Sequence, residues 1–274
     1  MVYCMKKDKI YQALLPLRVA TFEEIVAVAR AQGPAEASSK YIFTKYIDKL
    51  VKEGKLCRIQ KGIYGVLEPL DDQARYIPDK FLVGAKIRKG GFLSYRTALE
   101  LHGCAYSAFY NTVYVCVKRG ERFDPFSFRG LKFRPVFVQD AKGTEMVKYA
   151  GQEIRVTDKE RTFLDCLSKP RYAGGWEECL KSLQALEGLN FERLLAYLSE
   201  RGNKFLLRKV GFTLELLKQN SVFYEHLKDE QLQELRRGAR GPPSYLEPVE
   251  RGKLNKDWLL YVPEGFEERV LRGV

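Results

Sequence analysis

The chain has 274 residues and a formal net charge of +12, because 47 lysines and arginines outnumber 35 aspartates and glutamates. Hydrophobic residues make up 45% of it, enough for a real core, and no run of eighteen apolar residues or apolar leader is present. These features exclude an ordinary transmembrane helix and a signal peptide, so we predict a cytoplasmic globular protein with no membrane partner. The basic balance favours a polyanionic partner.

The first two predicted elements are short helices. Residues 6–15 form the first, which Pro16 ends. The second begins at a capping box, in which the Thr21 hydroxyl accepts a hydrogen bond from the backbone near Glu24 and the Glu24 carboxylate reaches back. It stops at Gly33-Pro34. The inward-facing residues of the two helices are expected to be Ile10, Ala13, Leu14, Phe22, Ile25, Val26 and Ala29.

A third helix is predicted from a cap at Ser38 or Ser39 to Gly54. Its inward stripe is expected to be Phe43, Ile47, Leu50 and Val51. Its opposite face carries hydroxyls, an exposed tyrosine and lysines, namely Ser38, Lys40, Tyr41, Thr44, Lys45, Lys49 and Lys52. Side chains of these types contact phosphates and base edges when a recognition helix enters a major groove.

A β-hairpin is predicted directly after this helix. Residues 56–60 and 63–66 alternate like strands, and Lys61-Gly62 supplies the turn between them. Three helices followed by such a hairpin predict a winged helix-turn-helix over residues 1–70, with the hairpin as its wing. The predicted DNA-binding residues are Ser38, Ser39, Lys40, Tyr41, Thr44, Lys45, Lys49, Arg58, Gln60 and Lys61. The predicted partner is double-stranded DNA.

The string from Ser39 to Tyr64, SKYIFTKYIDKLVKEGKLCRIQKGIY, closely resembles the N-terminal domain of the AbiEi-type antitoxins, described as predicted transcriptional regulators of viral defence systems. Further similar segments are GFLSYRTALELHG from Gly91, IRVTDKERTFLDCL from Ile154 followed by Gly174-Gly175, YLEP from Tyr245 to Pro248, and NKDWLLY from Asn255 to Tyr261. The resemblance implies a two-domain regulator that represses its own operon and opposes a nucleotidyltransferase-like toxin encoded beside it. It carries the DNA role to Ser38–Lys45 and Arg58–Lys61.

Residues 71–80 mix prolines and charges and are predicted to be a linker to a larger α+β domain, residues 81–274. In that domain strands are expected first, at 112–118, 131–138, 146–150 and 152–157, the last two as a hairpin. Helices are expected after them, near 158–169, 175–187, 190–200, 203–219 and 224–236, with a final strand at 258–262. Ser94 is expected to cap a shorter helix that ends at Gly103.

No active site stands out. The polar run from Thr157 to Asp165 is explained by an Arg161–Asp165 pair that fixes a helix against the sheet. The loose pattern Asp124, Asp140 and Lys142 keeps open a metal-dependent nuclease that uses the winged helix for targeting. A winged helix that binds only other proteins is a third reading.

Cysteines and histidines lack the spacing of a zinc site, so free, buried thiols and neither metal nor cofactor are expected. His102 is expected to cap or pack a helix end. The six cysteines are Cys4, Cys57, Cys104, Cys116, Cys166 and Cys179, and the two histidines are His102 and His226. We therefore predict a regulator that is not an enzyme.

Overall fold

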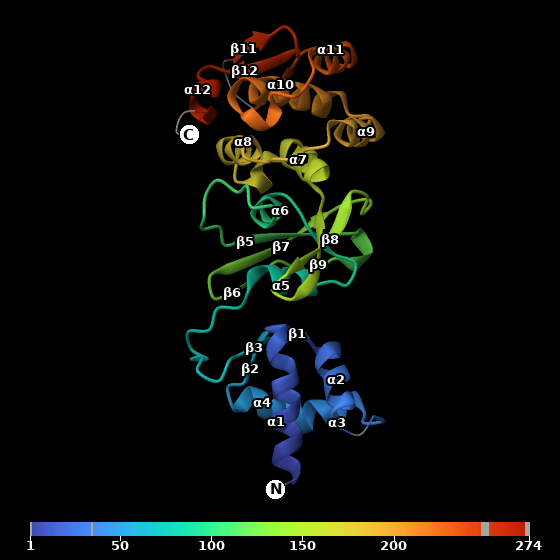
Figure 1. The fold of residues 1–274 in the computed structure, drawn as a ribbon, viewed down its shortest axis with the longest axis vertical. Coiled ribbons are helices and arrows are strands. Elements are labelled where there is room, and N and C mark those ends of the chain that lie inside the picture. The colour runs from blue at the N-terminus through green and yellow to red at the C-terminus, as the bar shows by residue number, and fades with distance from the viewer. Residues whose placement is uncertain (1, 34, 248–251, 272–274) are drawn as a thin grey trace. The chain divides into compact units, whose positions relative to one another are not determined.

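The computed structural model describes residues 2–33, 35–247 and 252–271 of an α+β protein (Figure 1). Pro34 and Pro248, which appear in the predictions above, lie outside the described residues. The N-terminal elements are α1 (Val2–Leu14), the 3-10 turn η1 (Leu15–Leu17), β1 (Val19–Thr21), α2 (Phe22–Ala31), α3 (Ser39–Ile42), the π-helical turn η2 (Phe43–Ile47), α4 (Asp48–Lys52), β2 (Leu56–Gln60) and β3 (Ile63–Val66). The central elements are α5 (Lys80–Lys86), β4 (Phe92–Leu93), α6 (Arg96–Leu101), β5 (Thr112–Val117), η3 (Arg119–Glu121), β6 (Phe126–Phe128), β7 (Leu131–Phe137), β8 (Thr144–Tyr149) and β9 (Gln152–Thr157).

The C-terminal elements are mainly helical. They are α7 (Lys159–Ser168), η4 (Pro170–Ala173), α8 (Trp176–Gln184), α9 (Phe191–Arg201), α10 (Lys204–Asn220), η5 (Val222–Tyr224), α11 (Asp229–Gly238), β10 (Ser244–Tyr245), β11 (Gly252–Asn255), β12 (Leu260–Pro263) and α12 (Phe266–Leu271). The helices α7 to α11 and the strand β12 lie within a few residues of their predicted positions, which confirms those predictions.

Contacts divide the chain into two compact units. Unit 1 comprises Met1–Phe92, Asn111–Asp140 and Met146–Arg155. Unit 2 comprises Leu93–Tyr110, Ala141–Glu145 and Val156–Val274. Unit 1 thus joins the first 70 residues to strands from further along the chain. The domain boundaries predicted from composition stay a prediction.

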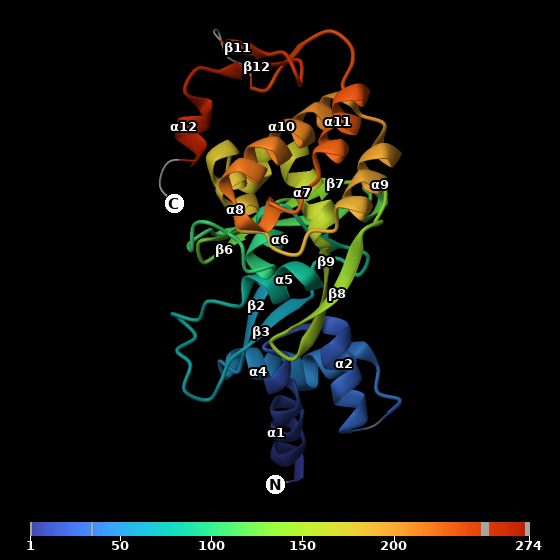
Figure 2. The same cartoon turned by 45° about the horizontal axis from the view of Figure 1, so that its top comes forward.

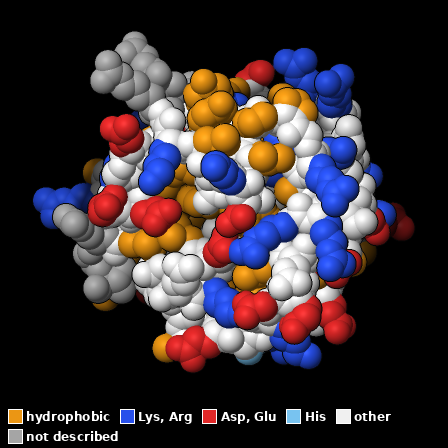
Figure 3. Space-filling view, turned by 90° about the horizontal axis from the view of Figure 1, so that it is seen from above, with side chains coloured by type: hydrophobic (Ala, Val, Ile, Leu, Met, Phe, Trp, Pro, Cys, Tyr) orange, Lys and Arg blue, Asp and Glu red, His pale blue; other side chains and the backbone are white. Residues whose placement is uncertain are grey.

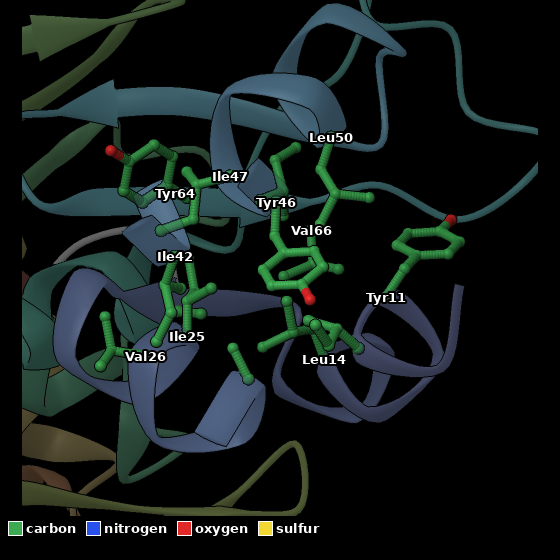
Figure 4. Packing of buried hydrophobic residues seen from close by; sticks show 14 residues of the cluster. Tyr11, Leu14, Ile25, Val26, Ile42, Tyr46, Ile47, Leu50, Tyr64 and Val66 are labelled. Atoms are coloured by element: carbon green, nitrogen blue, oxygen red, sulfur yellow. The ribbon is translucent and has the colours of Figure 1, made fainter. Parts of the chain in front are cut away.

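The helices of the N-terminal segment enclose one hydrophobic cluster (Figure 4). Its largest contributors come from α1, α2, the helix from α3 to α4, and β3, namely Ile10, Tyr11, Leu14, Ile25, Val26, Ile42, Tyr46, Ile47, Leu50, Tyr64 and Val66. Two inward-facing predictions were wrong: Ala13 is exposed, and Phe43 is 41% exposed. On α1, Tyr11 is buried together with Ile10 and Leu14, and its hydroxyl donates to the Leu67 carbonyl at 2.6 Å.

The predicted capping box is confirmed at the start of α2. The Glu24 backbone N–H donates to Thr21 Oγ1 at 3.1 Å, and the Thr21 N–H donates to Glu24 Oε2 at 2.7 Å. The other oxygen of the same carboxylate accepts from Lys86 Nζ of α5 at 2.7 Å. Glu24 therefore both starts α2 and ties it to the next part of unit 1.

The strands β2 and β3 form an antiparallel hairpin, and β1 pairs with the free side of β3, giving the order β1-β3-β2. The hairpin turns at Lys61-Gly62, where the φ of Gly62 is +81°. A glycine adopts this backbone conformation without the steric cost of a Cβ. The Phe22 N–H donates to the Gly62 carbonyl at 2.8 Å, so the turn is held against the start of α2.

Part of the segment predicted as a linker packs on this small sheet. The Tyr76 ring lies so close to Gly65 that a Cβ there would overlap it, and the Tyr76 hydroxyl donates to the Arg18 carbonyl at 3.3 Å. Gln152 Nε2 of β9 donates to the Leu17 carbonyl at 2.5 Å. These contacts join the N-terminal helices and small sheet to Tyr76 and β9 within unit 1.

The larger sheet has the order β6-β7-β5-β4-β9-β8. β5 and β7 run parallel, with Thr112 opposite Lys132 and Val117 opposite Phe137, while β6 is antiparallel to β7. β8 and β9 lie side by side in Figure 2, as the predicted hairpin requires. Their turn, Ala150-Gly151, has positive φ at both residues, the conformation that two-residue hairpins favour.

A buried carboxylate organises the polar interior of unit 2. Asp165 of α7 accepts from Ser94 Oγ at 2.9 Å and from Arg201 Nη2 at 2.7 Å, and it lies 3.4 Å from Arg161 Nε. The prediction that Ser94 caps α6 was wrong: Tyr95 is the N-cap residue, and the Ser94 hydroxyl is used by Asp165 instead. The Arg161–Asp165 pair is confirmed, with Arg201 as an additional partner.

The five cysteines whose side chains are described, Cys57, Cys104, Cys116, Cys166 and Cys179, are buried and form no disulfide bond. The side chain of Cys4 lies outside the described residues. Within residues 2–33, 35–247 and 252–271, no helix combines the length and apolar character needed to cross a membrane.

A close contact between α10 and the C-terminal strands gives a first stability prediction. Trp258 is fully buried, its Nε1 donates to Glu215 Oε2 at 2.5 Å, and a Cβ on Gly211 would overlap its indole ring. Because forcing atoms into a packed site costs about 1–3 kcal/mol, we expect Gly211→Ala to lower the free energy of unfolding by that amount. Tryptophan fluorescence during urea unfolding measures it, since both tryptophans belong to unit 2. Gly120→Ala, with open space around the added atom, should differ from wild type by less than about 0.5 kcal/mol; because Gly120 belongs to unit 1, which holds neither tryptophan, its unfolding is followed by circular dichroism.

Candidate nucleic-acid interface

The predicted third helix is continuous from Ser39 to Lys52 but contains a π turn. The Asp48 N–H donates to the Phe43 carbonyl, five residues back, where an α-helix would bond four residues back. The wider turn explains why Ile42 and Ile47, five residues apart, are both buried. It also carries Phe43 out of the core, where its ring lies 6.4 Å from that of Phe22.

Local bonds fix the beginning of this helix. Ser38 is the N-cap residue, and its Oγ accepts from the Tyr41 N–H at 3.2 Å, as one of the two predicted caps. Thr44 Oγ1 donates to the Lys40 carbonyl at 3.1 Å, so both residues lie on one face. Lys45 Nζ lies 5.9 Å from the centre of the Tyr41 ring. The first two turns therefore present an ordered polar surface.

Most of the predicted site residues on this helix are solvent-facing. Ser38, Lys40, Thr44 and Lys49 are exposed, Tyr41 is 43% exposed, and Ser39 and Lys45 are half-buried. The residues at the start of the helix, without Lys49, form together with Phe43 a surface that we call the α3 face, defined as Ser38, Ser39, Lys40, Tyr41, Phe43, Thr44 and Lys45.

The C-terminal end of the helix has a different electrostatic character. Lys52 pairs with Asp48 at 2.7 Å, and Lys55 pairs with Asp8 at 2.9 Å. The hydrogen bond from Lys7 lowers the pKa of the Glu53 carboxyl, and the hydrogen bond to Asp8 raises the pKa of Lys55. The acidic side chains Asp48 and Glu53 of this stretch are thus each paired with a lysine.

The hairpin adds positive charge at a second place. Arg58 of β2 and Lys61 of the turn are exposed, while Gln60 is half-buried. The Gln60 Oε1 atom is buried and, within the described part of the chain, lacks a hydrogen-bond partner. A bulge between Arg58 and Gln60 shifts the register of β2 against β3, which alters the direction of the side chains near the turn.

The residues of the nuclease reading are exposed. These are Asp124, Asp140 and Lys142, and Lys142 Nζ pairs with Glu200 Oε2 at 2.9 Å. Among the residues that the structure describes, no three histidine, cysteine, aspartate or glutamate side chains are grouped to hold a metal ion. His102 is the C-cap residue of α6, as expected, and its Nε2 lies 2.9 Å from the Thr157 carbonyl. Burial lowers the pKa of His102.

The face over α10–α12 differs from the α3 face. In Figure 3, lysine and arginine side chains are interspersed with aspartate, glutamate and hydrophobic side chains. Mixed charge of this kind is ordinary for a solvated protein surface. The α3 face and the hairpin carry the exposed Lys40, Arg58 and Lys61.

No family model matches this chain, and no curated protein matches it. Among solved structures, the crystal structure of the RV2827C protein from Mycobacterium tuberculosis is similar, with a TM-score of 0.61 and 13% sequence identity. The similarity covers 93% of this chain and 90% of that chain. At this identity it shows a shared α+β fold along nearly the whole length.

Proposed function

We propose that residues 1–70 form a winged helix-turn-helix and that the protein is a sequence-specific, double-stranded-DNA-binding transcriptional regulator. The helix from α3 to α4 acts as the recognition helix, and β2–β3 acts as the wing. The three-helix cluster of Figure 4 and the strand order β1-β3-β2 support this assignment. In such modules the second helix of the pair enters the major groove.

The observation that carries the proposal is the α3 face. It joins exposed lysine, tyrosine and threonine side chains on the first two turns of a helix packed on a rigid core. Exposed Arg58 and Lys61 follow on the hairpin directly after that helix. Lysine and arginine neutralise phosphates and set affinity, whereas side chains in the groove read bases.

Selection from a library of randomised duplexes, without divalent metal, tests this function. The proposal expects a recurring sequence to be enriched over several rounds. Recovery of the input distribution would contradict sequence-specific recognition. Absence of any duplex binding at low salt would instead favour the reading in which the module binds only other proteins.

Thr44 gives a prediction about base readout. Its hydroxyl hydrogen is engaged by the Lys40 carbonyl, so its oxygen is left to accept from the exocyclic amino group of adenine or cytosine. We expect Thr44→Val to reduce the preference for the selected sequence over scrambled DNA by about tenfold, since losing recognition of one base pair typically costs about 1–3 kcal/mol. Affinity for scrambled DNA should be unchanged, and Thr44→Ser should keep the preference. Competition titrations with the two duplexes measure both quantities.

Tyr41, whose ring lies beside Lys45 on the α3 face, gives a second prediction about base readout. Tyr41→Ala should erode sequence preference more than it weakens overall binding, because phosphate contacts come from the lysines. An equal loss for selected and scrambled duplexes would assign Tyr41 to the phosphates and contradict a reading role.

The resemblance to AbiEi-type antitoxins supports a narrower form of the proposal. In that form the protein represses its own operon, uses no cofactor and performs no catalysis, and acts in the cytoplasm against a nucleotidyltransferase-like toxin encoded nearby. A reporter fused to the upstream DNA should be repressed by the protein. Relief of toxicity of the neighbouring gene on co-expression would support the antitoxin role, and unchanged toxicity would contradict it.

A further inference from the structure

Phe43 is an apolar side chain on a face made of polar ones. It is 41% exposed, although its spacing in the sequence is that of a core residue. The π turn that begins at this residue displaces it from the stripe formed by Ile42, Ile47 and Leu50. Its exposure therefore follows from the backbone of the helix and is not the chance placement of a flexible side chain.

The contacts of the α3 face show where Phe43 lies on it. Thr44 and Lys40 are joined by a hydrogen bond and mark the middle of the face. Lys45 lies over the Tyr41 ring, which marks one flank. Phe43 pairs with the ring of Phe22 at the start of α2 and so forms the other flank, facing the preceding helix.

The phenyl ring on this flank is uncharged and apolar, so it is unsuited to a phosphate and suited to the one base that presents an apolar group in the major groove. A phenyl ring offers neither a hydrogen-bond donor nor an acceptor, so it cannot distinguish the polar edges of bases. The apolar group that the major groove presents is the 5-methyl group of thymine, and phenylalanine is among the side chains that contact it. Lys40 and Lys45 beside it, and Arg58 and Lys61 on the hairpin, complement the flanking phosphates in charge.

We propose that Phe43 is a specificity-determining residue that reads the 5-methyl group of thymine in the major groove. This inference rests on the proposed function, because it needs α3 to enter the groove. It identifies the target as a site that contains thymine opposite the α2 side of the recognition helix. The Phe22 ring lies 6.4 Å from the Phe43 ring at an interplanar angle of 54°, and this contact limits the movement of the Phe43 side chain.

The test compares two preparations of one duplex, the DNA upstream of the protein's own gene, amplified with either thymidine or deoxyuridine triphosphate. Deoxyuridine lacks only the 5-methyl group and leaves pairing intact. Scrambled duplexes made in the same two ways correct for general effects of uracil on DNA shape. We expect wild-type protein to bind the uracil form of the upstream duplex about threefold to tenfold more weakly, as loss of an apolar base contact implies.

Phe43→Ala should bind the thymine and uracil forms equally, and Phe43→Leu should keep part of the difference. Phe137→Ala, which removes a phenylalanine of β7 that is 48% exposed, is the matched control and should retain the full difference. Thermal unfolding of each variant shows that it is folded at the assay temperature.

Failure of the proposed role of Phe43 and failure of the proposed function give different results. Wild-type protein that prefers upstream over scrambled DNA but binds thymine and uracil forms alike would overturn the role of Phe43 and leave the regulator intact. A Phe43→Ala variant that still discriminates the two forms would overturn it as well. Binding that does not distinguish upstream from scrambled DNA would contradict the proposed function itself.

Discussion

Replacing Lys40 or Lys45 by glutamate is expected to weaken binding to the upstream DNA by about tenfold or more at 0.1 M salt. Each lysine that neutralises a phosphate releases condensed counterions, and losing one contact removes about one unit from the slope of log affinity against log salt. Both lysines lie on the first two turns of the helix, where the α3 face would meet the groove. Charge reversal adds repulsion to the lost contact. Fluorescence anisotropy at several salt concentrations gives the affinity and the slope together.

The control for this prediction is Lys256→Glu, which makes the same change in net charge at an exposed residue outside the proposed interface. It should change affinity by less than about threefold, because it leaves the charges of the α3 face and the hairpin unchanged and salt screens a single exposed charge elsewhere. Equal losses for Lys256→Glu and the two variants on the α3 face would mean that overall charge, and not docking by α3, governs binding. Unchanged affinity for both Lys40→Glu and Lys45→Glu would contradict the docking arrangement.

Asp165→Ala is expected to produce the largest loss of stability, about 3–5 kcal/mol, because it leaves buried positive charge without its partner. Asp165 is 5% exposed and binds the Ser94 hydroxyl and the guanidinium of Arg201, with Arg161 beside it. Unfolding followed by tryptophan fluorescence reports on this unit, which contains both Trp176 and Trp258.

Two further variants make the Asp165 prediction sharper. Asp165→Asn keeps the shape and part of the hydrogen bonding and should lose less stability than the alanine variant. Arg193→Ala, at an arginine whose side chain is 53% exposed and which lies 3.6 Å from Glu160, should cost less than about 1 kcal/mol. A loss below about 1 kcal/mol for Asp165→Ala would show that the cluster does not organise the interior of unit 2.

Local signals in the sequence predicted local structure well. The capping box at Thr21 and Glu24 depends on residues three apart, and the structure contains both of its bonds. The turns at Lys61-Gly62 and Ala150-Gly151 were predictable for the same reason, since glycine with its neighbour determines how two strands are joined. Cap and turn chemistry act within a few residues and need no tertiary context.

Features that depend on distant partners were not predictable. Phe43 was assigned to the core because a period of 3.6 residues was assumed, and no local signal marks the π turn that shifts it. Ser94 has the chemistry of a helix cap, but its hydroxyl is bound by Asp165, 71 residues away in sequence. Tyr76 lies in a segment without periodicity, yet it packs on Gly65. In each case a tertiary contact or an irregular turn outweighs the local preference.

In the candidate site, too, features set by nearby residues were predictable and features set by an irregular backbone were not. Residue types on the α3 face predicted which side chains are exposed at Lys40, Tyr41 and Thr44, because amphipathic periodicity is a local property. Gln60 is half-buried and lies beside the bulge in β2, and residue types alone do not reveal that bulge. The backbone therefore adds Phe43 to the residues of the proposed interface and shows that Gln60 is half-buried.

The most direct test of the central claim is an anisotropy titration of the DNA upstream of the protein's gene against scrambled DNA of the same composition, at two salt concentrations and without divalent metal. We predict that the upstream DNA binds more tightly and that its advantage persists at the higher salt, because base contacts are less sensitive to counterions than phosphate contacts. Equal affinity for the two DNAs, lost equally with salt, would contradict sequence-specific recognition by the α3 face.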